Sequence, residues 1–175
     1  PPLRIGVAGL GNVGATLVRI LQKDGPDLTR KLGRQVVVVA VAARSRSRDR
    51  GIDISGLEWF DDPVALAKSE GIDLFVELIG GEDGPAFAAV KAALEIGRPV
   101  VTANKALLAK HGVALARLAE EAGAQLGFEA AVAGGIPVIK TLREGLGSAS
   151  IAKVFGIMNG TCNYILTRMG NENIS

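Results

Sequence analysis

The most constraining feature of the sequence is a glycine-rich turn close to its N-terminus. Residues 9–14 read Gly-Leu-Gly-Asn-Val-Gly, and the apolar run Leu3–Ala8 leads directly into them. Residues 13–23 follow with the apolar spacing of an amphipathic helix. A strand, a Gly-x-Gly-x-x-Gly turn and a helix, in that order, are typical of a Rossmann-type dinucleotide-binding unit. A glycine turn with a purely structural role in an α/β protein is the alternative interpretation.

Each glycine of this turn has an expected role. Gly9 permits a tight turn, Gly11 lets a pyrophosphate approach the backbone, and Gly14 lets the helix pack closely against the strand. The pyrophosphate would accept hydrogen bonds from free N–H groups at the positive end of the helix. The residues of the turn that we expect to bind the cofactor are Gly9, Leu10, Gly11, Asn12, Val13 and Gly14.

Strands and helices alternate along the chain as far as residue 129. Residues 36–43 are almost all β-branched or alanine, which is typical of a strand buried on both faces. The other expected strands cover 3–8, 57–60, 73–79, 99–102 and 125–129, and the expected helices cover 13–23, 63–70, 85–96 and 104–122. Asp24-Gly25-Pro26 is expected to end the first helix. With right-handed crossovers this order predicts an α/β fold with a doubly wound parallel sheet.

The pattern changes near residue 130, where we place a domain boundary. Gly134-Gly135-Ile136-Pro137 is expected to open a helix that runs to residue 144, followed by a strand over 150–158 and a last helix over 161–169. Residues 1–130 would form the dinucleotide-binding domain, and 131–175 the truncated start of an α+β domain. The strand would expose an apolar edge unless it self-associates.

Composition excludes several other classes of function. The net charge of +2 gives no reason to expect a nucleic-acid partner, and no apolar run reaches the roughly 18 residues of a membrane span. Cys162 is the only cysteine, so an intrachain disulfide is impossible, which fits a cytoplasmic protein. His111 is the only histidine and has no evident partner in its expected helix, which argues against a His/Cys metal site and a Ser-His-Asp triad.

The end of the second strand bears on which dinucleotide binds. NAD-preferring sites usually offer an acid there to the ribose hydroxyls, but the sequence reads Ala-Ala-Arg-Ser-Arg-Ser-Arg over 42–48. A guanidinium beside a hydroxyl suits a 2′-phosphate, so we favour NADP, with Arg44 as the expected contact. The alternative is a solvated basic loop, and we expect Arg46, Arg48 and Arg50 to face solvent.

Lys105 follows the expected strand over 99–102 and begins a helix. Ligands of open α/β sheets bind at the carboxyl ends of strands, so Lys105 is expected near the cofactor or substrate. A lone lysine elsewhere would be interpreted as a surface residue.

Four segments, spread over nearly the whole chain, carry a family resemblance. They are the turn at 9–14, Val-Thr-Ala-Asn-Lys-Ala-Leu at 101–107, Phe-Glu-Ala-Ala-Val-Ala-Gly-Gly-Ile-Pro at 128–137 and Gly-Ile-Met-Asn-Gly-Thr-Cys-Asn-Tyr-Ile-Leu at 156–166. Together they resemble homoserine dehydrogenase, and the last two are more specific than the glycine turn. Members of that family reduce L-aspartate 4-semialdehyde to L-homoserine with NAD(P)H, in threonine and methionine biosynthesis.

The resemblance implies roles for particular residues. Lys105 matches the lysine beside the nicotinamide and substrate, and Gly80 and Thr102 are expected among the cofactor-binding residues. The family's monovalent cation site, usually holding sodium, matches Glu129 with the carbonyls of Val132, Gly134 and Ile136. The residues expected to line the cleft near the nicotinamide are Asn159, Gly160 and Thr161. From the residues alone, Glu129 and Asn159 are equally consistent with helix caps.

The resemblance also implies that some catalytic residues of the family are not part of this chain. The family's substrate-binding acids and its proposed acid/base lysine lie beyond residue 175, so the chain is expected to bind cofactor without turnover. The full-length protein is expected to be a homodimer or tetramer. A non-catalytic dinucleotide-binding or regulatory module is the alternative. Another two-domain oxidoreductase, such as a sugar dehydrogenase, is disfavoured because Asn104-Lys105-Ala106 stands where those enzymes have Glu-Lys-Pro.

Overall fold

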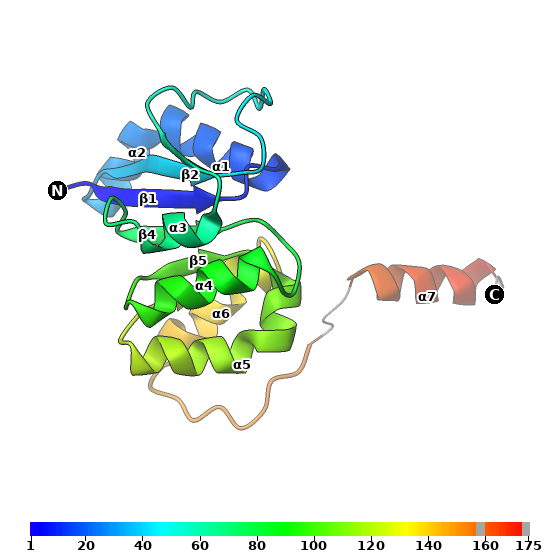
Figure 1. Cartoon of the computed structure of the whole chain (residues 1–175). Coiled ribbons are helices and arrows are strands. Elements are labelled where there is room, and N and C mark those ends of the chain that lie inside the picture. Colours follow the sequence, from blue (N-terminus) through cyan, green and yellow to red (C-terminus); the bar gives the residue numbers. More distant parts are fainter. Residues whose placement is uncertain (157–159, 173–175) are drawn as a thin grey trace. The chain divides into compact units, whose positions relative to one another are not determined.

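The structure is a computed structural model, and it describes residues 1–156 and 160–172. The chain divides into two compact units, Pro1–Gly135 and Ile136–Ser175, which are described separately (Figure 1). Within the described residues, no helix is both long enough and apolar enough to cross a membrane.

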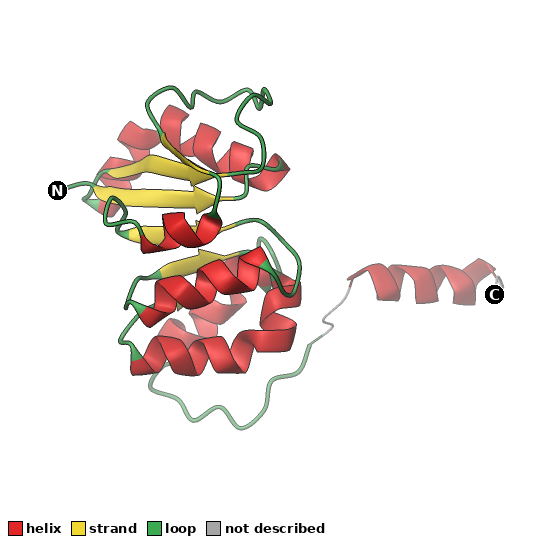
Figure 2. Cartoon of the chain, in the orientation of Figure 1, coloured by secondary structure: helices red, strands yellow, loops and turns green. Residues whose placement is uncertain are grey.

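A six-stranded parallel sheet forms the centre of the first unit (Figure 2). Its strands lie in the order β3-β2-β1-β4-β5-β6, so the direction of winding reverses between β1 and β4. Such a reversal opens a crevice at the carboxyl ends of the two central strands. The strands are β1 (Leu3–Ala8), β2 (Val36–Ala42), β3 (Glu58–Phe60), β4 (Leu74–Glu77), β5 (Val100–Thr102) and β6 (Leu126–Gly127).

Helices cover both faces of this sheet, because the strands bury side chains on both sides. Val7 packs with Val18 of α1 on one face, whereas the next residue, Ala8, packs with residues of α3, α4 and α5 on the other. Phe75 is completely buried on that second face. The helices are α1 (Asn12–Lys23), α2 (Gly25–Leu32), α3 (Pro63–Lys68), α4 (Pro85–Glu95) and α5 (Lys105–Glu121). The predicted α/β fold with a doubly wound parallel sheet is confirmed.

One helix, α2, was not predicted from the sequence. The expected stop at 24–26 is confirmed, because α1 ends at Lys23 with Asp24 as its C-cap, but a further helix, α2, begins at once, since Gly25 and Pro26 occupy its first turn, where the missing N–H of proline is tolerated. The end of α2 lies at Gly33, whose φ of 66° is left-handed. The helix expected over 104–122 is confirmed as α5, which continues through Gly112 because Leu107, Leu115 and Ala119 hold it against the core on both sides of that glycine.

The second unit contains helices but lacks the expected strand within its described part. It comprises α6 (Val138–Lys140), the π-helical turn η2 (Thr141–Gly145) and α7 (Gly160–Glu172). Residues 150–156 have no regular secondary structure, so that part of the predicted strand is wrong, and residues 157 and 158 lie outside the described residues. A strand needs a hydrogen-bonding neighbour, and no strand of the described chain pairs with this segment. The side chain of Phe155 is 86% exposed as a result.

Candidate functional site

The site lies in the first unit, where three loops meet at the carboxyl ends of the central strands. The glycine turn leaves β1, a second loop leaves β4, and a third links β5 to α5. The N–H of Gly9 donates to the carbonyl of Ala42 at 2.8 Å, and the N–H of Leu78 donates to the carbonyl of Ala8 at 2.7 Å. These bonds extend the strand ladders into the loops and fix where each loop begins.

The three glycines of the turn differ in how much space surrounds them. Gly9 has a φ of 95°, and a Cβ there would lie 2.4 Å from the carbonyl of Leu78. A Cβ at Gly14 would lie 1.8 Å from the carbonyl oxygen of Gly9. Gly11, in contrast, has no atom within 4 Å of a built Cβ. Gly9 and Gly14 therefore permit close backbone packing, and Gly11 borders open space.

The open space at Gly11 adjoins the N-terminus of α1. Gly11 caps this helix without a side-chain hydrogen bond, and the first turn contains no acidic residue. The first intrahelical bond runs from the N–H of Ala15 to the carbonyl of Gly11 at 2.9 Å. The helix start thus has N–H donors, a positive dipole end and room beside it, a combination that suits a phosphate or pyrophosphate.

The basic loop after β2, defined as residues 44–50, borders the glycine turn. Arg44, Arg46 and Arg48 are exposed, and no ion pair involves them within the described ranges 1–156 and 160–172. Arg50 behaves differently, because its side chain folds back and donates to the carbonyl of Leu10 at 3.1 Å. The prediction that Arg50 faces solvent is therefore wrong. A basic run in the sequence does not indicate which of its members meets backbone acceptors.

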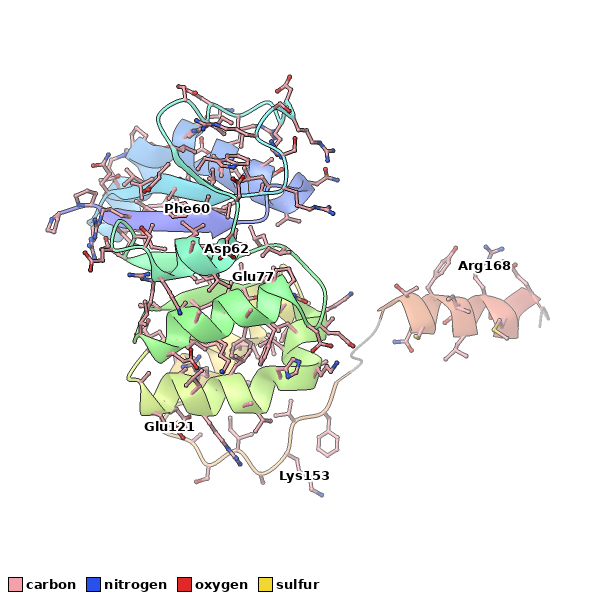
Figure 3. The ribbon with its side chains drawn as sticks, in the orientation of Figure 1. Phe60, Asp62, Glu77, Glu121, Lys153 and Arg168 are labelled. Carbon is pink, nitrogen blue, oxygen red and sulfur yellow. The ribbon has the colours of Figure 1, made fainter. Side chains whose placement is uncertain are left out.

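Glu77, which no sequence motif singled out, lies at the end of β4 (Figure 3). Its side chain is completely buried. One carboxyl oxygen accepts from the N–H groups of Ile79 at 2.7 Å and Gly80 at 3.1 Å, and the other accepts from the hydroxyl of Thr102 at 2.5 Å. The signal in the sequence was a charged residue at the end of an otherwise apolar strand, since such residues are rarely buried without a role.

The hydrogen bonds continue from Thr102 to the start of α5. The Thr102 hydroxyl accepts from the N–H of Asn104 at 3.0 Å. The side-chain carbonyl of Asn104 caps α5 by accepting from the N–H of Leu107 at 3.1 Å, and its amide donates to the carbonyl of Gly81 at 2.6 Å. Two residues predicted to bind cofactor, Gly80 and Thr102, are thus joined through Glu77, and their contact with a cofactor stays a prediction.

Lys105 is the first residue of α5, directly after this capping asparagine. Its side chain is exposed, and it forms no ion pair with any residue that the structure describes. The Asn104 cap and the buried network therefore fix the backbone of Lys105, and its exposed cationic side chain projects from the start of α5.

The distal part of the β4–α4 loop is anchored to α5. Asp83 accepts hydrogen bonds from Lys110 and, at 2.7 Å, from Nε2 of His111, whose ring stacks on Phe87 with 4.2 Å between centroids. Hydrogen bonds from Lys110, and then from His111, hold the pKa of Asp83 below its ordinary value. His111 therefore has a partner that its helix alone did not indicate, and the pair holds the loop in place.

Three residues of the predicted cation site, Glu129, Val132 and Gly134, lie in the first unit around a strained segment. Glu129 begins the short 3-10 helix η1 (Glu129–Ala131), and Val132 and Gly134 follow it. Between these two lies Ala133, whose φ of 50° is the only positive value among the non-glycine residues described. Such strain is characteristic of functional segments. Ile136 lies in the second unit, where its carbonyl accepts from the N–H of Val138 at 2.8 Å, and its part in a cation site stays a prediction.

The remaining predicted residues belong to the second unit. Asn159 lies outside the described residues, and Gly160 and Thr161 begin α7. Their expected position near the nicotinamide stays a prediction.

The described residues contain no group of three or more His, Cys, Asp or Glu side chains arranged to hold a metal ion. The predicted cation site consists mainly of backbone carbonyls, so it would not form such a group of side chains.

Comparison with known proteins gives a consistent result. Residues 9–129 match the family model "Homoserine dehydrogenase, NAD binding domain", and residues 137–175 match "Homoserine dehydrogenase". A homoserine dehydrogenase of Mycobacterium tuberculosis H37Rv is 45% identical over 168 residues, which cover 96% of this chain and 37% of the relative. The chain therefore spans well under half the length of that relative.

Solved structures agree with the family match. A homoserine dehydrogenase from Thiobacillus denitrificans superposes with a TM-score of 0.84 at 41% identity, over 99% of this chain and 40% of that one. A hyperthermophilic archaeal homoserine dehydrogenase mutant, solved in complex with NADPH, gives a TM-score of 0.68 at 26% identity, over 85% of this chain and 50% of that one.

The contrast between Gly11 and Gly14 gives a first prediction. Gly14→Ala is expected to lower the free energy of unfolding by about 1–3 kcal/mol, because its Cβ overlaps a backbone oxygen. Gly11→Ala, at a φ of −73°, is expected to change it by less than about 0.5 kcal/mol but to weaken NADPH binding about tenfold. Urea unfolding and calorimetry measure the two effects. Undiminished NADPH affinity in Gly11→Ala would show that the open space is not the pyrophosphate site.

Glu77→Gln gives a second prediction. The amide can present only one acceptor oxygen, so either the Thr102 hydroxyl or the two loop N–H groups lose their acceptor. We expect the free energy of unfolding to fall by about 1–3 kcal/mol. The matched control is Glu121→Gln at the exposed end of α5 (Figure 3), for which a change below about 0.5 kcal/mol is expected. Equal urea midpoints for the two variants would contradict the importance of the network.

Proposed function

The chain belongs to the homoserine dehydrogenase family, and from this premise we propose that it is the cofactor-binding part of an NADP(H)-dependent enzyme that interconverts L-aspartate 4-semialdehyde and L-homoserine. Residues 1–130 would bind the cofactor, and 131–175 would begin the substrate and dimerisation domain. The observation that carries the proposal is the uncapped start of α1 beside the open space at Gly11, within the family's NAD-binding domain. The reaction would serve threonine and methionine biosynthesis.

The residues of the chain itself divide the work of binding. The N–H groups of Gly11, Asn12 and Val13 would donate to the pyrophosphate, where the helix dipole favours negative charge. Lys105 would act as a catalytic residue at the edge of the crevice, placing a positive charge beside the nicotinamide and the substrate. A bound nicotinamide supplies the hydride, and the protein contributes orientation and electrostatics.

Three observations support NADP over NAD. The structured end of β2 offers no acid to the ribose hydroxyls, and the residues that follow are Arg44 and Ser45. Arg44 has no acidic partner among the described residues, so its forked donors are available to a 2′-phosphate. The archaeal relative was solved with NADPH.

We propose that Glu129 and the carbonyls of Val132 and Gly134 would bind sodium or a similar monovalent cation, and the family resemblance adds the carbonyl of Ile136 to this set. Hard oxygen ligands suit such an ion. The left-handed backbone of Ala133, between two of these residues, supports the proposal because strained backbone is characteristic of functional segments. The ion would stabilise the segment that leaves the cofactor-binding domain.

The full-length protein is proposed to be a cytoplasmic homodimer or tetramer. The second unit has many exposed apolar side chains, and the described part of α7 has no buried residue, which supports further protein surface around it. A dinucleotide-binding module without catalysis is the second candidate, because the uncapped start of α1 and the open space at Gly11 are features of cofactor binding alone.

Turnover separates the two candidates. We expect the full-length protein to oxidise NADPH when L-aspartate 4-semialdehyde is added, followed at the absorbance of NADPH, and we expect the 175-residue chain to bind NADPH without oxidising it. Lys105→Met in the full-length protein should lower kcat while leaving the Kd of NADPH within about twofold, since one exposed contact to the nicotinamide contributes little to ground-state binding. A full-length protein that binds NADPH but never oxidises it would establish the binding module.

Arg44→Asp tests the choice of cofactor. A carboxylate at this position repels a 2′-phosphate and can accept hydrogen bonds from ribose hydroxyls. We expect calorimetry to show that NADPH affinity falls at least about tenfold while NADH affinity is kept or rises. Arg46→Asp, a similarly exposed neighbour, provides the control for general loss of positive charge. Equal weakening of both dinucleotides by Arg44→Asp would refute the phosphate role.

A further inference from the structure

Arg50 links the basic loop to the glycine turn through a set of three backbone contacts. Its Nε donates to the carbonyl of Leu10 at 3.1 Å, its Nη1 to that of Arg48 at 2.7 Å and its Nη2 to that of Ser45 at 2.6 Å. A guanidinium has a rigid planar fork of five N–H donors, so three simultaneous contacts fix the three carbonyls relative to one another. A lysine, with a single nitrogen, cannot reproduce this arrangement.

The contact with Leu10 determines the direction of the neighbouring N–H. The peptide between Leu10 and Gly11 is trans, since none of the described residues has a cis peptide bond. In a planar trans peptide the C=O and the following N–H point in opposite directions. Arg50 holds the C=O toward the loop, so the N–H of Gly11 points away from the loop at the residue that borders open space.

The contacts with Ser45 and Arg48 shape the basic loop. They fold residues 45–50 into a turn, and Arg44 directly precedes this turn. The guanidinium also lies over the ring of Trp59, with its carbon 5.8 Å from the ring centroid. Arg19 of α1 donates to the carbonyls of Arg50 and Gly51 at 3.3 and 3.5 Å, which holds the backbone of Arg50 in place.

We infer that Arg50 is a positioning residue for dinucleotide selectivity, which orients the Gly11 N–H toward the pyrophosphate and places Arg44 and Ser45 for the 2′-phosphate. The inference rests on the proposed function, because it assigns to Arg50 the geometry of a site that NADP(H) would occupy. Arg50 itself contacts neither phosphate in this assignment. It acts through the glycine turn and through the basic loop at the same time.

The test compares Arg50→Lys with the parent 175-residue chain by calorimetry with NADPH and with NADH. Lysine keeps the positive charge but lacks the planar fork of the guanidinium. Both dinucleotides are therefore expected to bind at least about tenfold more weakly, because one or more oriented hydrogen bonds to a charged ligand are lost. The loss should be larger for NADPH, because the loop that carries Arg44 is released as well. Arg46→Lys, the matched control, should stay within about twofold of the parent for both ligands.

Trp59 supplies a readout that is independent of binding. It is the only tryptophan of the chain, and Arg50 lies over its ring, so release of the fork should change the tryptophan emission of the ligand-free protein. Arg46→Lys should leave that emission unchanged. Circular dichroism and the Tm then verify that the variant keeps its fold.

A second variant keeps the inference falsifiable if Arg50→Lys does not fold. Arg19→Met removes two contacts to the backbone at Arg50 and Gly51 without altering the guanidinium of Arg50. It should weaken the binding of both dinucleotides, again more for NADPH than for NADH, but by a smaller factor than Arg50→Lys.

The possible outcomes distinguish failure of the role inferred for Arg50 from failure of the proposed function. Unchanged affinities in Arg50→Lys would mean that charge alone matters and would overturn the inference. Weaker NADPH binding with unchanged NADH binding would make Arg50 a direct phosphate contact and would also overturn it. A parent chain that binds neither dinucleotide would instead refute the proposed function.

Discussion

The carboxyl group of Glu77 is completely buried between two parallel strands, and the geometry of the crevice depends on the hydrogen bonds that it accepts. Without those partners, burial of so polar a group would cost several kcal/mol. Its partners are the loop after β4 and, through Thr102, the cap of α5. None of the buried side-chain nitrogen or oxygen atoms in the described residues lacks a hydrogen bond, so the network is complete. A complete buried network favours one arrangement of its loops.

Around this network, two kinds of constraint hold the glycine turn. Steric constraint acts on one side, where Gly9 and Gly14 leave no space for a side chain against the backbone. Polar constraint acts on the other, where Arg50 binds the carbonyl of Leu10 from a loop 40 residues away in the sequence. The turn is therefore held before any ligand binds, and preorganisation of this kind reduces the entropic cost of binding.

The two units differ in how much of their apolar surface they bury. The first unit has two hydrophobic clusters, one on each face of its sheet. The second has no such core among its described residues, and α7 carries the exposed side chains of Tyr164 and Leu166. Residues 150–156, the described part of the run predicted as a strand, have no regular structure, because sequence pattern is a weak determinant where no neighbouring strand supplies hydrogen bonds.

The sequence by itself determined the fold of the first unit and the location of its site. Turn chemistry and apolar periodicity are local, so the strand, turn and helix over residues 3–23 could be predicted from neighbouring residues, and β1 and α1 lie where they were expected. Only the tertiary structure decided that Glu77 is the hub of the crevice, that Arg50 leaves the solvated run of arginines, and that His111 binds Asp83. The contacts that decide these points, Glu77 with Thr102, Arg50 with Leu10 and His111 with Asp83, each join residues more than 20 positions apart, and no local pattern encodes which distant donor meets a given acceptor.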